Sequence, residues 1–313
     1  MEGIGVRLAY KIFLPDSLTE VHKFDHDEYT NKALSEHPPV IFLHGITNTK
    51  ETWDDCGQTV ANKTTTKVYT LDARNHGDSE WTEKMDYVVM ADDVARFMDS
   101  IGIQTANIIG HSMGGKTAMY FALRHSDRVH AMIIEDMMFV DPKVCEEIGR
   151  HYLLLLTEVL DKIPLHVDLL EAKRIAARHL TATEQKVDRT KALTPLHEWD
   201  GRDLPLKLKP EGGYEWKTNL EAIHGFITRK EFTPSEVLEE IGKDPETIYD
   251  GPVLVIYGTH SILNVLSGKE EFVRWFPKTV YEPAEGATHT IHIEYPETFT
   301  ELVCNFILKC RDI

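Results

Sequence analysis

The sequence predicts an α/β fold in which a mostly parallel β-sheet carries helices on both faces and a helical cap is inserted into the chain. Two observations predict the sheet and its helices: short, continuous apolar runs recur along the chain, and amphipathic stretches with helical periodicity separate them. Such alternation of strand and helix is typical of parallel sheets. A third observation predicts the cap, because the alternation is interrupted once, between about residues 141 and 225.

Strands are predicted where apolar residues follow one another and the run then ends in a polar residue or a glycine. Residues 40–43 (Val-Ile-Phe-Leu) form such a run, which His44 and Gly45 follow. A continuous apolar run of this kind is typical of a strand buried on both faces. In chain order, the predicted strands are residues 6–13, 40–43, 68–71, 106–109, 129–134, 253–257 and 279–281.

Helices are predicted between these runs, where apolar residues recur at helical spacing. A polar stretch over residues 16–37, followed by Pro38 and Pro39, is predicted as a loop. The predicted helices of the sheet domain are residues 52–62, 88–100, 114–124, 270–276 and 296–308.

The interruption in the pattern contains two Leu-rich segments, residues 153–160 and 169–180, that are predicted as helices, and it contains no strong strand pattern. Because the segments on both sides belong to one sheet, we interpret this region as an insertion rather than an independent second domain. The predicted core therefore comprises residues 1–140 and 222–313, and the predicted cap comprises residues 141–221. We expect the cap to lie over the carboxyl ends of the strands, where ligand sites of α/β proteins lie.

Composition excludes several classes of protein. Hydrophobic residues make up 42% and charged residues 27%, as in a globular protein, and no apolar run is long enough to span a membrane. The formal net charge of −17 repels phosphate backbones, so nucleic acid is not an expected partner. The four cysteines form no CxxC pair and the N-terminus does not resemble a signal peptide, so we expect free thiols and a cytoplasmic protein.

The strongest chemical motif is Gly110-His111-Ser112-Met113-Gly114, which stands directly after a predicted strand and before a predicted helix. A serine on a sharp strand-to-helix turn adopts a strained backbone conformation, and small neighbours are needed to avoid clashes. The turn raises the hydroxyl above the sheet, and the following helix N-terminus points N–H groups at developing negative charge. We therefore predict that Ser112 is a nucleophile rather than part of an ordinary turn.

A serine nucleophile needs a general base, which on this kind of fold follows the last strand of the sheet. His289 stands in such a loop, shortly after Gly286, and is the predicted base. His292 is the second candidate, although we expect it at the start of the closing helix. A metal site built on both histidines lacks a cluster that supplies a third ligand, so no metal is expected.

The acidic member of the site is less obvious. The loop after the fifth continuous apolar run, residues 258–264, is the usual position for it and contains no carboxylate. The preceding strand ends in Glu135 and Asp136, and successive strand residues point to opposite sides, so only one of the two faces the site. Asp136, at the strand tip, is the predicted acid, and Glu221 and Asp141 are the alternatives.

Two backbone N–H groups are predicted to hold the oxyanion of an acyl-transfer intermediate. One belongs to Met113, directly after the proposed nucleophile. The other is predicted at Ile46, because Gly45 permits a close approach of the chain.

Four stretches occur in this order along the chain, and together they resemble the α/β-hydrolase superfamily: His44-Gly45, residues 72–79 (Asp-Ala-Arg-Asn-His-Gly-Asp-Ser), residues 110–118 and the loop of His289. The second and third stretches resemble the branch that contains alpha/beta-hydrolase domain-containing protein eleven and related small esterases. The resemblance implies an α/β-hydrolase fold and hydrolysis of an ester, a thioester or an acylglycerol. It also implies an acid at Asp136, or at Glu221 in an alternative assignment, and its animal members imply that a mitochondrial location is possible.

These observations predict a serine carboxylesterase or lipase-like enzyme that acts through Ser112, His289 and Asp136, without a cofactor, on a small-molecule acyl ester. An acyltransferase, a carbon–carbon bond hydrolase and a non-catalytic binding protein of the same fold are the alternatives. Arg74 and Asp78 are expected to brace their turn by hydrogen bonds and ion pairs rather than to contact substrate.

Overall fold

The computed structural model describes residues 5–19, 37–139, 142–187, 199–228 and 247–311, together with residues 235–236, 239 and 244. Within these ranges, only the backbone is described for residues 142–148 and 183–187.

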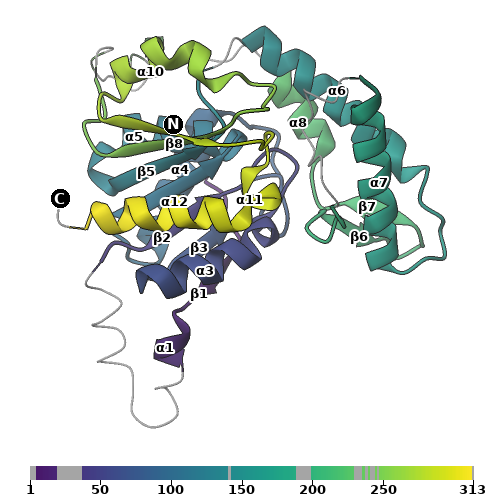
Figure 1. The fold of residues 1–313 in the computed structure, drawn as a ribbon. Coiled ribbons are helices and arrows are strands. Elements are labelled where there is room, and N and C mark those ends of the chain that lie inside the picture. The colour runs from purple at the N-terminus through teal and green to yellow at the C-terminus, as the bar shows by residue number, and fades with distance from the viewer. Residues whose placement is uncertain are drawn as a thin grey trace.

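A seven-stranded sheet forms the centre of the molecule (Figure 1). Its strands lie in the order β1 (Tyr10–Phe13), β3 (Val68–Leu71), β2 (Val40–Leu43), β4 (Ala106–His111), β5 (Val129–Glu135), β8 (Val253–Gly258) and β9 (Thr279–Ala284). All neighbouring strands are parallel except β1, which pairs antiparallel with β3. The predicted mostly parallel sheet is confirmed.

Helices cover both faces of this sheet, and each face has its own apolar core (Figure 1). The helices α4 (Tyr87–Ser100), α5 (Met113–Arg124) and α10 (Lys269–Trp275) cover one face, and α3 (Asp54–Thr64) and α12 (Pro296–Lys309) cover the other. Alternating residues of the central strands divide between the two cores: Ile134 of β5 packs in the first and Ile133 in the second. This division explains why the central strands are apolar without interruption.

Short helical segments complete the sheet domain. They are α1 (Asp16–Thr19), the 3₁₀ turns η2 (Lys50–Trp53), η3 (Ser126–Arg128) and η4 (Val265–Gly268), and α11 (Ile291–Glu294). Among the described residues, no helix is both long and apolar enough to cross a membrane.

The chain leaves the sheet between β5 and β8 and forms α6 (Pro142–Leu160), α7 (Leu169–Val187) and α8 (Leu220–Ile227), which lie together beside the sheet domain (Figure 1). A third apolar cluster joins this inserted segment to the sheet domain, because it contains Met113 as well as residues of the three helices. The helix α8 crosses the predicted boundary at residue 221 and packs against α6. The predicted bounds of the cap stay a prediction.

The inserted segment also contains a two-stranded antiparallel hairpin of β6 (Leu206–Leu208) and β7 (Tyr214–Trp216). The sequence predicts no strong strand here, so the hairpin corrects that prediction. Each strand has only three residues, which is too short to produce a recognisable alternation, and the surrounding prolines and glycines are typical of a loop.

Candidate active site

Ser112 occupies a sharp turn between β4 and α5 and has φ 52° and ψ −115°. A positive φ is unusual for a serine and strained. Neighbouring backbone explains the flanking glycines: a Cβ on Gly110 would lie 2.2 Å from the carbonyl oxygen of Gly114, and one on Gly114 would lie 2.2 Å from that of Leu43. The strand–turn–helix geometry predicted from the glycine pattern is therefore present.

His289 and Asp136 lie in contact, although they come from different parts of the sheet. Asp136 directly follows β5, has φ 45° and is fully buried. Its Oδ2 atom lies 2.7 Å from Nδ1 of His289, which stands in the loop after β9. In the neutral imidazole, this contact places the proton on Nδ1 and leaves Nε2 as a proton acceptor.

Two further donors hold the Asp136 carboxylate. The backbone N–H of Gly258 donates to Oδ1 at 3.0 Å, and the hydroxyl of Ser261 donates to Oδ2. Both residues belong to the end of β8 and the loop that follows, where the sequence analysis found no acid. Ser261 was not predicted, and its signal in the sequence is weak, because one polar residue without charge does not stand out in a loop.

The structure separates the two candidate histidines and the candidate acids. His292 lies in α11 and pairs with Glu135, whereas His289 pairs with Asp136. Glu221 is exposed in the first turn of α8. Asp141 lies outside the described residues.

The loop that follows β2 passes close to the turn of Ser112. A Cβ on Gly45 would lie 2.6 Å from Nδ1 of His111 and 3.4 Å from Cβ of Ser112, so only a glycine leaves the chain room to approach the serine. Ile46 comes next and is half-buried, and Met113 is the first residue of α5. N–H groups in the first turn of a helix have no partner within the helix. The oxyanion role of the Met113 and Ile46 N–H groups stays a prediction.

Two buried histidines fix the conformation of this loop. Nε2 of His44 accepts the N–H of Ala73 at 3.0 Å, and Nε2 of His76 accepts the N–H of Thr47 at 3.2 Å. Each Nδ1 faces a backbone carbonyl, that of Gly45 in the case of His44. Burial lowers the pKa of His44 to about 4 and, with the nearby His44 ring, lowers the pKa of His76 to about 3. Both rings are therefore neutral at pH 7 and act as donor and acceptor at once.

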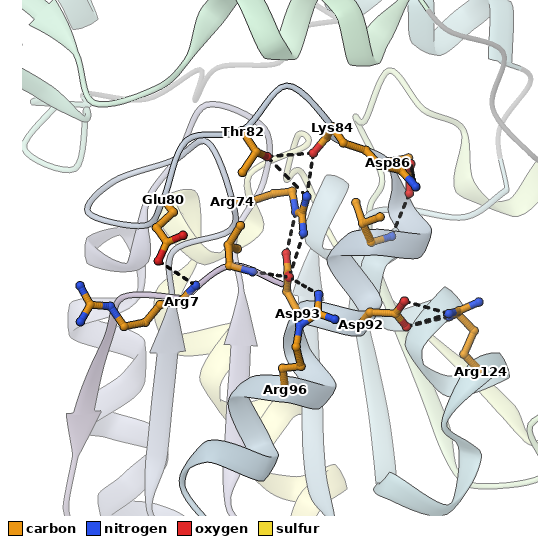
Figure 2. Close-up of polar contacts among 12 residues, drawn as sticks. Arg7, Arg74, Glu80, Thr82, Lys84, Asp86, Asp92, Asp93, Arg96 and Arg124 are labelled. Carbon is orange, nitrogen blue, oxygen red and sulfur yellow. Dashed lines mark hydrogen bonds and ion pairs between the residues drawn. The ribbon is translucent and has the colours of Figure 1, made fainter. Parts of the chain in front are cut away.

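The stretch 72–79 is braced by ion pairs, as predicted. The Arg74 side chain is 2% exposed and donates to both carboxylate oxygens of Asp93, at 2.6 and 2.9 Å, and to the carbonyl of Lys84 at 2.7 Å (Figure 2). Nζ of Lys50 lies 2.6 Å from carboxylate oxygens of both Asp72 and Asp78. The Lys50 contacts join this stretch to η2, which follows the loop that carries Gly45.

Comparisons with known proteins identify the family to which this fold belongs. A family model described as alpha/beta hydrolase fold matches residues 38–296. The chain belongs to the alpha/beta hydrolase family. The resemblance seen in the sequence motifs is confirmed.

The names of two relatives of this α/β-hydrolase chain describe different reactions. It is 31% identical to a Xenopus laevis protein named sn-1-specific diacylglycerol lipase ABHD11, over 92% of this chain and 85% of the relative. It is 28% identical to ethanol acetyltransferase 1 of Wickerhamomyces ciferrii, over 96% of this chain and 74% of the relative. Among solved structures, one titled marine microorganism esterase superposes with a TM-score of 0.67 at 23% identity, over 96% of this chain and 100% of the other.

One group of side chains in this α/β-hydrolase chain has the composition of a metal site. His111, Glu135 and His292 offer ligand-type atoms that lie within 4.8 Å of one another. However, both carboxylate oxygens of Glu135 lie 2.9 Å from Nδ1 of His292, and Nε2 of His111 lies 2.9 Å from the carbonyl of His289. A cation held by Glu135 and His292 would have to displace the contact between them, so these two residues favour a hydrogen-bonded pair over a metal site. The Nδ1 atom of His111 has no hydrogen-bond partner among the described residues.

A polar cleft lies between the sheet domain and the inserted segment. Its lining includes Thr52 and His292 from the sheet domain and Lys173, Trp199 and Asp203 from the inserted segment. His292 is three residues beyond His289, so the cleft reaches the loop that carries the predicted base.

Proposed function

We propose that this chain is a serine carboxylesterase or lipase-like hydrolase that cleaves a carboxylic ester through Ser112, His289 and Asp136. The observation that carries the proposal is the 2.7 Å contact between Nδ1 of His289 and Oδ2 of Asp136. The carbonyl of His289 also contacts His111, which directly precedes a serine held at positive φ on a strand-to-helix turn. The constellation matches the roles of nucleophile, base and orienting acid.

The reaction begins when Nε2 of His289 takes the proton of the Ser112 hydroxyl as Oγ attacks the acyl carbon. Asp136 keeps the imidazole in the required tautomer and stabilises the imidazolium that forms. The N–H groups of Met113 and Ile46 hold the oxyanion of the tetrahedral intermediate. His289 then gives its proton to the leaving alcohol, which leaves an acyl-enzyme on Ser112.

Hydrolysis of the acyl-enzyme repeats these roles with water. His289 takes a proton from the water, the hydroxide attacks the acyl carbon, and Ser112 leaves with the returned proton. Both half-reactions use the same groups: the side chains of Ser112, His289 and Asp136 and the N–H groups of Met113 and Ile46.

The substrate class that we propose is an ester with an apolar acyl chain, including acylglycerols. Met113 belongs to the apolar cluster of the inserted segment, which also contains Leu156 and Trp216, and Ile46 packs against that cluster. An apolar acyl chain leaving the oxyanion site therefore meets apolar surface. We propose that α6 to α8 act as the cap over this site. The relatives named as diacylglycerol lipases support the assignment.

Acyl transfer to an alcohol is a second candidate, because relatives named ethanol acetyltransferase 1 match 96% of the chain. The two reactions share the acyl-enzyme and differ only in whether water or an alcohol receives the acyl group. Carbon–carbon bond hydrolysis and a purely binding role remain alternatives without a specific supporting contact.

The test is to incubate the purified protein with p-nitrophenyl esters from acetyl to long-chain acyl and with a diacylglycerol, with and without added ethanol. We expect free fatty acid as the main product, and loss of turnover in Ser112→Ala. Formation of ethyl ester in preference to free acid would favour the acyltransferase, and absence of turnover by folded wild-type protein would favour the binding role.

A further inference from the structure

A second buried carboxylate–imidazole pair lies directly beside the first. Glu135 precedes Asp136 at the end of β5, and both Glu135 and His292 have fully buried side chains. Both oxygens of Glu135 lie 2.9 Å from Nδ1 of His292, and Oε1 also accepts the backbone N–H of His292 at 2.8 Å. Consecutive residues at one strand tip therefore each hold one histidine of the segment 289–292, which runs from the loop after β9 into α11.

Glu135 also contacts the serine side of the site through its backbone. Its carbonyl accepts the N–H of Ser112 at 3.2 Å, and it stands opposite His111 in the parallel pairing of β4 and β5. One residue thus fixes the turn of the proposed nucleophile by its main chain and the loop of the proposed base by its side chain.

His111 anchors the other end of that loop. Its Nε2 atom lies 2.9 Å from the carbonyl of His289, and its ring centre lies 4.7 Å from the ring of His289 and 4.9 Å from that of His292. Burial and the neighbouring rings of His289 and His292 lower the pKa of His111 well below its usual value. The neutral ring therefore donates from Nε2 to the His289 carbonyl.

The far side of the His292 ring is held as well. Its Nε2 atom lies 3.2 Å from Oγ1 of Thr52, and its ring centre lies 4.3 Å from that of Trp53. The ring therefore has one orientation, in which Nδ1 faces Glu135.

We propose that Glu135 and His292 are positioning residues of the active site. Neither contacts the reacting atoms in the mechanism above; together they fix residues 289–292 so that the His289 ring keeps its contact with Asp136. Stability alone does not explain a charged side chain at position 135, because apolar residues often fill such a buried position at least as stably as a charged pair does. The inference rests on the proposed function, because it assigns these residues a role in that reaction.

The test compares wild type with Glu135→Gln, which keeps the shape of the side chain and an acceptor for the His292 N–H but removes the charge. We expect kcat for a p-nitrophenyl ester to fall about 10- to 100-fold with little change in KM, because a small displacement of a catalytic group is costly while substrate contacts stay intact. We also expect the acidic limb of the kcat/KM profile to move to lower pH, because a negative charge near the base is lost. Asp136, His111 and His292 also lie near His289. The substitution keeps Asp136 and His111 as they are and removes the charge that faces His292.

Two further variants separate positioning from general destabilisation. Asp92→Asn is a matched carboxylate-to-amide change in the pair between Asp92 and Arg124, which joins α4 to α5 (Figure 2); we expect it to leave kcat and the pH profile unchanged. His292→Phe leaves the Glu135 charge without its partner, and adding Glu135→Gln should restore part of the lost activity, since an unpaired buried charge is the larger cost.

A readout that does not depend on turnover is the low-field proton resonance of the His289 Nδ1–H group, assigned by its loss in Asp136→Asn. We expect Glu135→Gln to shift or broaden it. A folded Glu135→Gln protein with wild-type kcat, pH profile and resonance would overturn the positioning role. Failure of the proposed function has a different signature, because wild-type protein would then hydrolyse no ester whatever the resonance shows.

Discussion

The Oδ2 atom of Asp136 lies 2.7 Å from Nδ1 of His289, although 153 residues separate the two in the chain. The contact joins the tip of a central strand to the loop after the last strand, and the hydroxyl of Ser261 donates to the same carboxylate oxygen. In the neutral imidazole this contact places the proton on Nδ1 and makes Nε2 the proton acceptor, which is the atom that a serine nucleophile requires.

Asp136→Asn should lower kcat for ester hydrolysis on the order of 10⁴-fold, because an amide at this position favours the wrong imidazole tautomer. The measurement is kcat on a p-nitrophenyl ester, with circular dichroism as the check on folding. Glu221→Gln is the matched control and should stay near wild type, because Glu221 is exposed on α8. A larger loss from Glu221→Gln than from Asp136→Asn would move the acid to the inserted segment.

Ser261→Ala should lower kcat by about 10- to 100-fold, much less than Asp136→Asn does. The substitution removes one donor to Asp136 but leaves the Gly258 N–H at 3.0 Å, and a hydrogen bond to a charged group contributes roughly 1.5–3 kcal/mol. Steady-state kinetics should show the loss in kcat with KM unchanged. Wild-type kinetics in this variant would mean that Ser261 only closes its own loop, through its contact with the N–H of Leu263.

Gly45→Ala should reduce kcat on the order of 10²-fold or more, because its Cβ would lie 2.6 Å from Nδ1 of His111 and would displace the loop of the second oxyanion donor. The matched control is Gly225→Ala in α8, where a new Cβ has nothing within 4 Å and alanine favours the helix. The measurement is kcat of the two variants. Equal kcat values for Gly45→Ala and Gly225→Ala would contradict a role of the Gly45 loop in the reaction.

The free energy of unfolding should decrease as the pH falls below about 6.5. The unfolded chain protonates its histidines near the usual value of 6.5, whereas in the folded state burial lowers the pKa of His44 to about 4 and that of His76 to about 3. Between these values the unfolded state binds more protons, so acid favours unfolding, and this contribution to stability is fully present only above about pH 6.5.

Urea unfolding at pH 7.5 and pH 5 measures this effect. His76→Gln, which cannot titrate, should show a smaller decrease in midpoint over the same interval than wild type does. Equal decreases in the two proteins would assign the acid sensitivity to other groups.

Much of the sheet could be predicted from the sequence, because its central strands are buried on both faces and are therefore apolar without interruption. Ser112 could be located for a similar reason, since only glycine fits where Gly110 and Gly114 approach other backbone. Local sequence carries both signals.

Contacts across long sequence separations could not be predicted in the same way. The alternation of strand residues indicated that Glu135 and Asp136 point apart, but it did not indicate that each meets a histidine of the segment 289–292. Ser261 was missed because the sequence analysis looked for a carboxylate in its loop, whereas the structure uses a hydroxyl there to hold the carboxylate of Asp136. These pairings depend on the register of β5 against β8, which no local pattern encodes.

The central claim is that Ser112 is an activated nucleophile, and labelling with a fluorophosphonate probe tests it most directly. Wild-type protein should be labelled covalently, mass spectrometry should locate the label on Ser112, and Ser112→Ala should remain unlabelled. Asp136→Asn should be labelled far more slowly. Folded wild-type protein that takes up no label, or takes it up at another residue, would contradict the account.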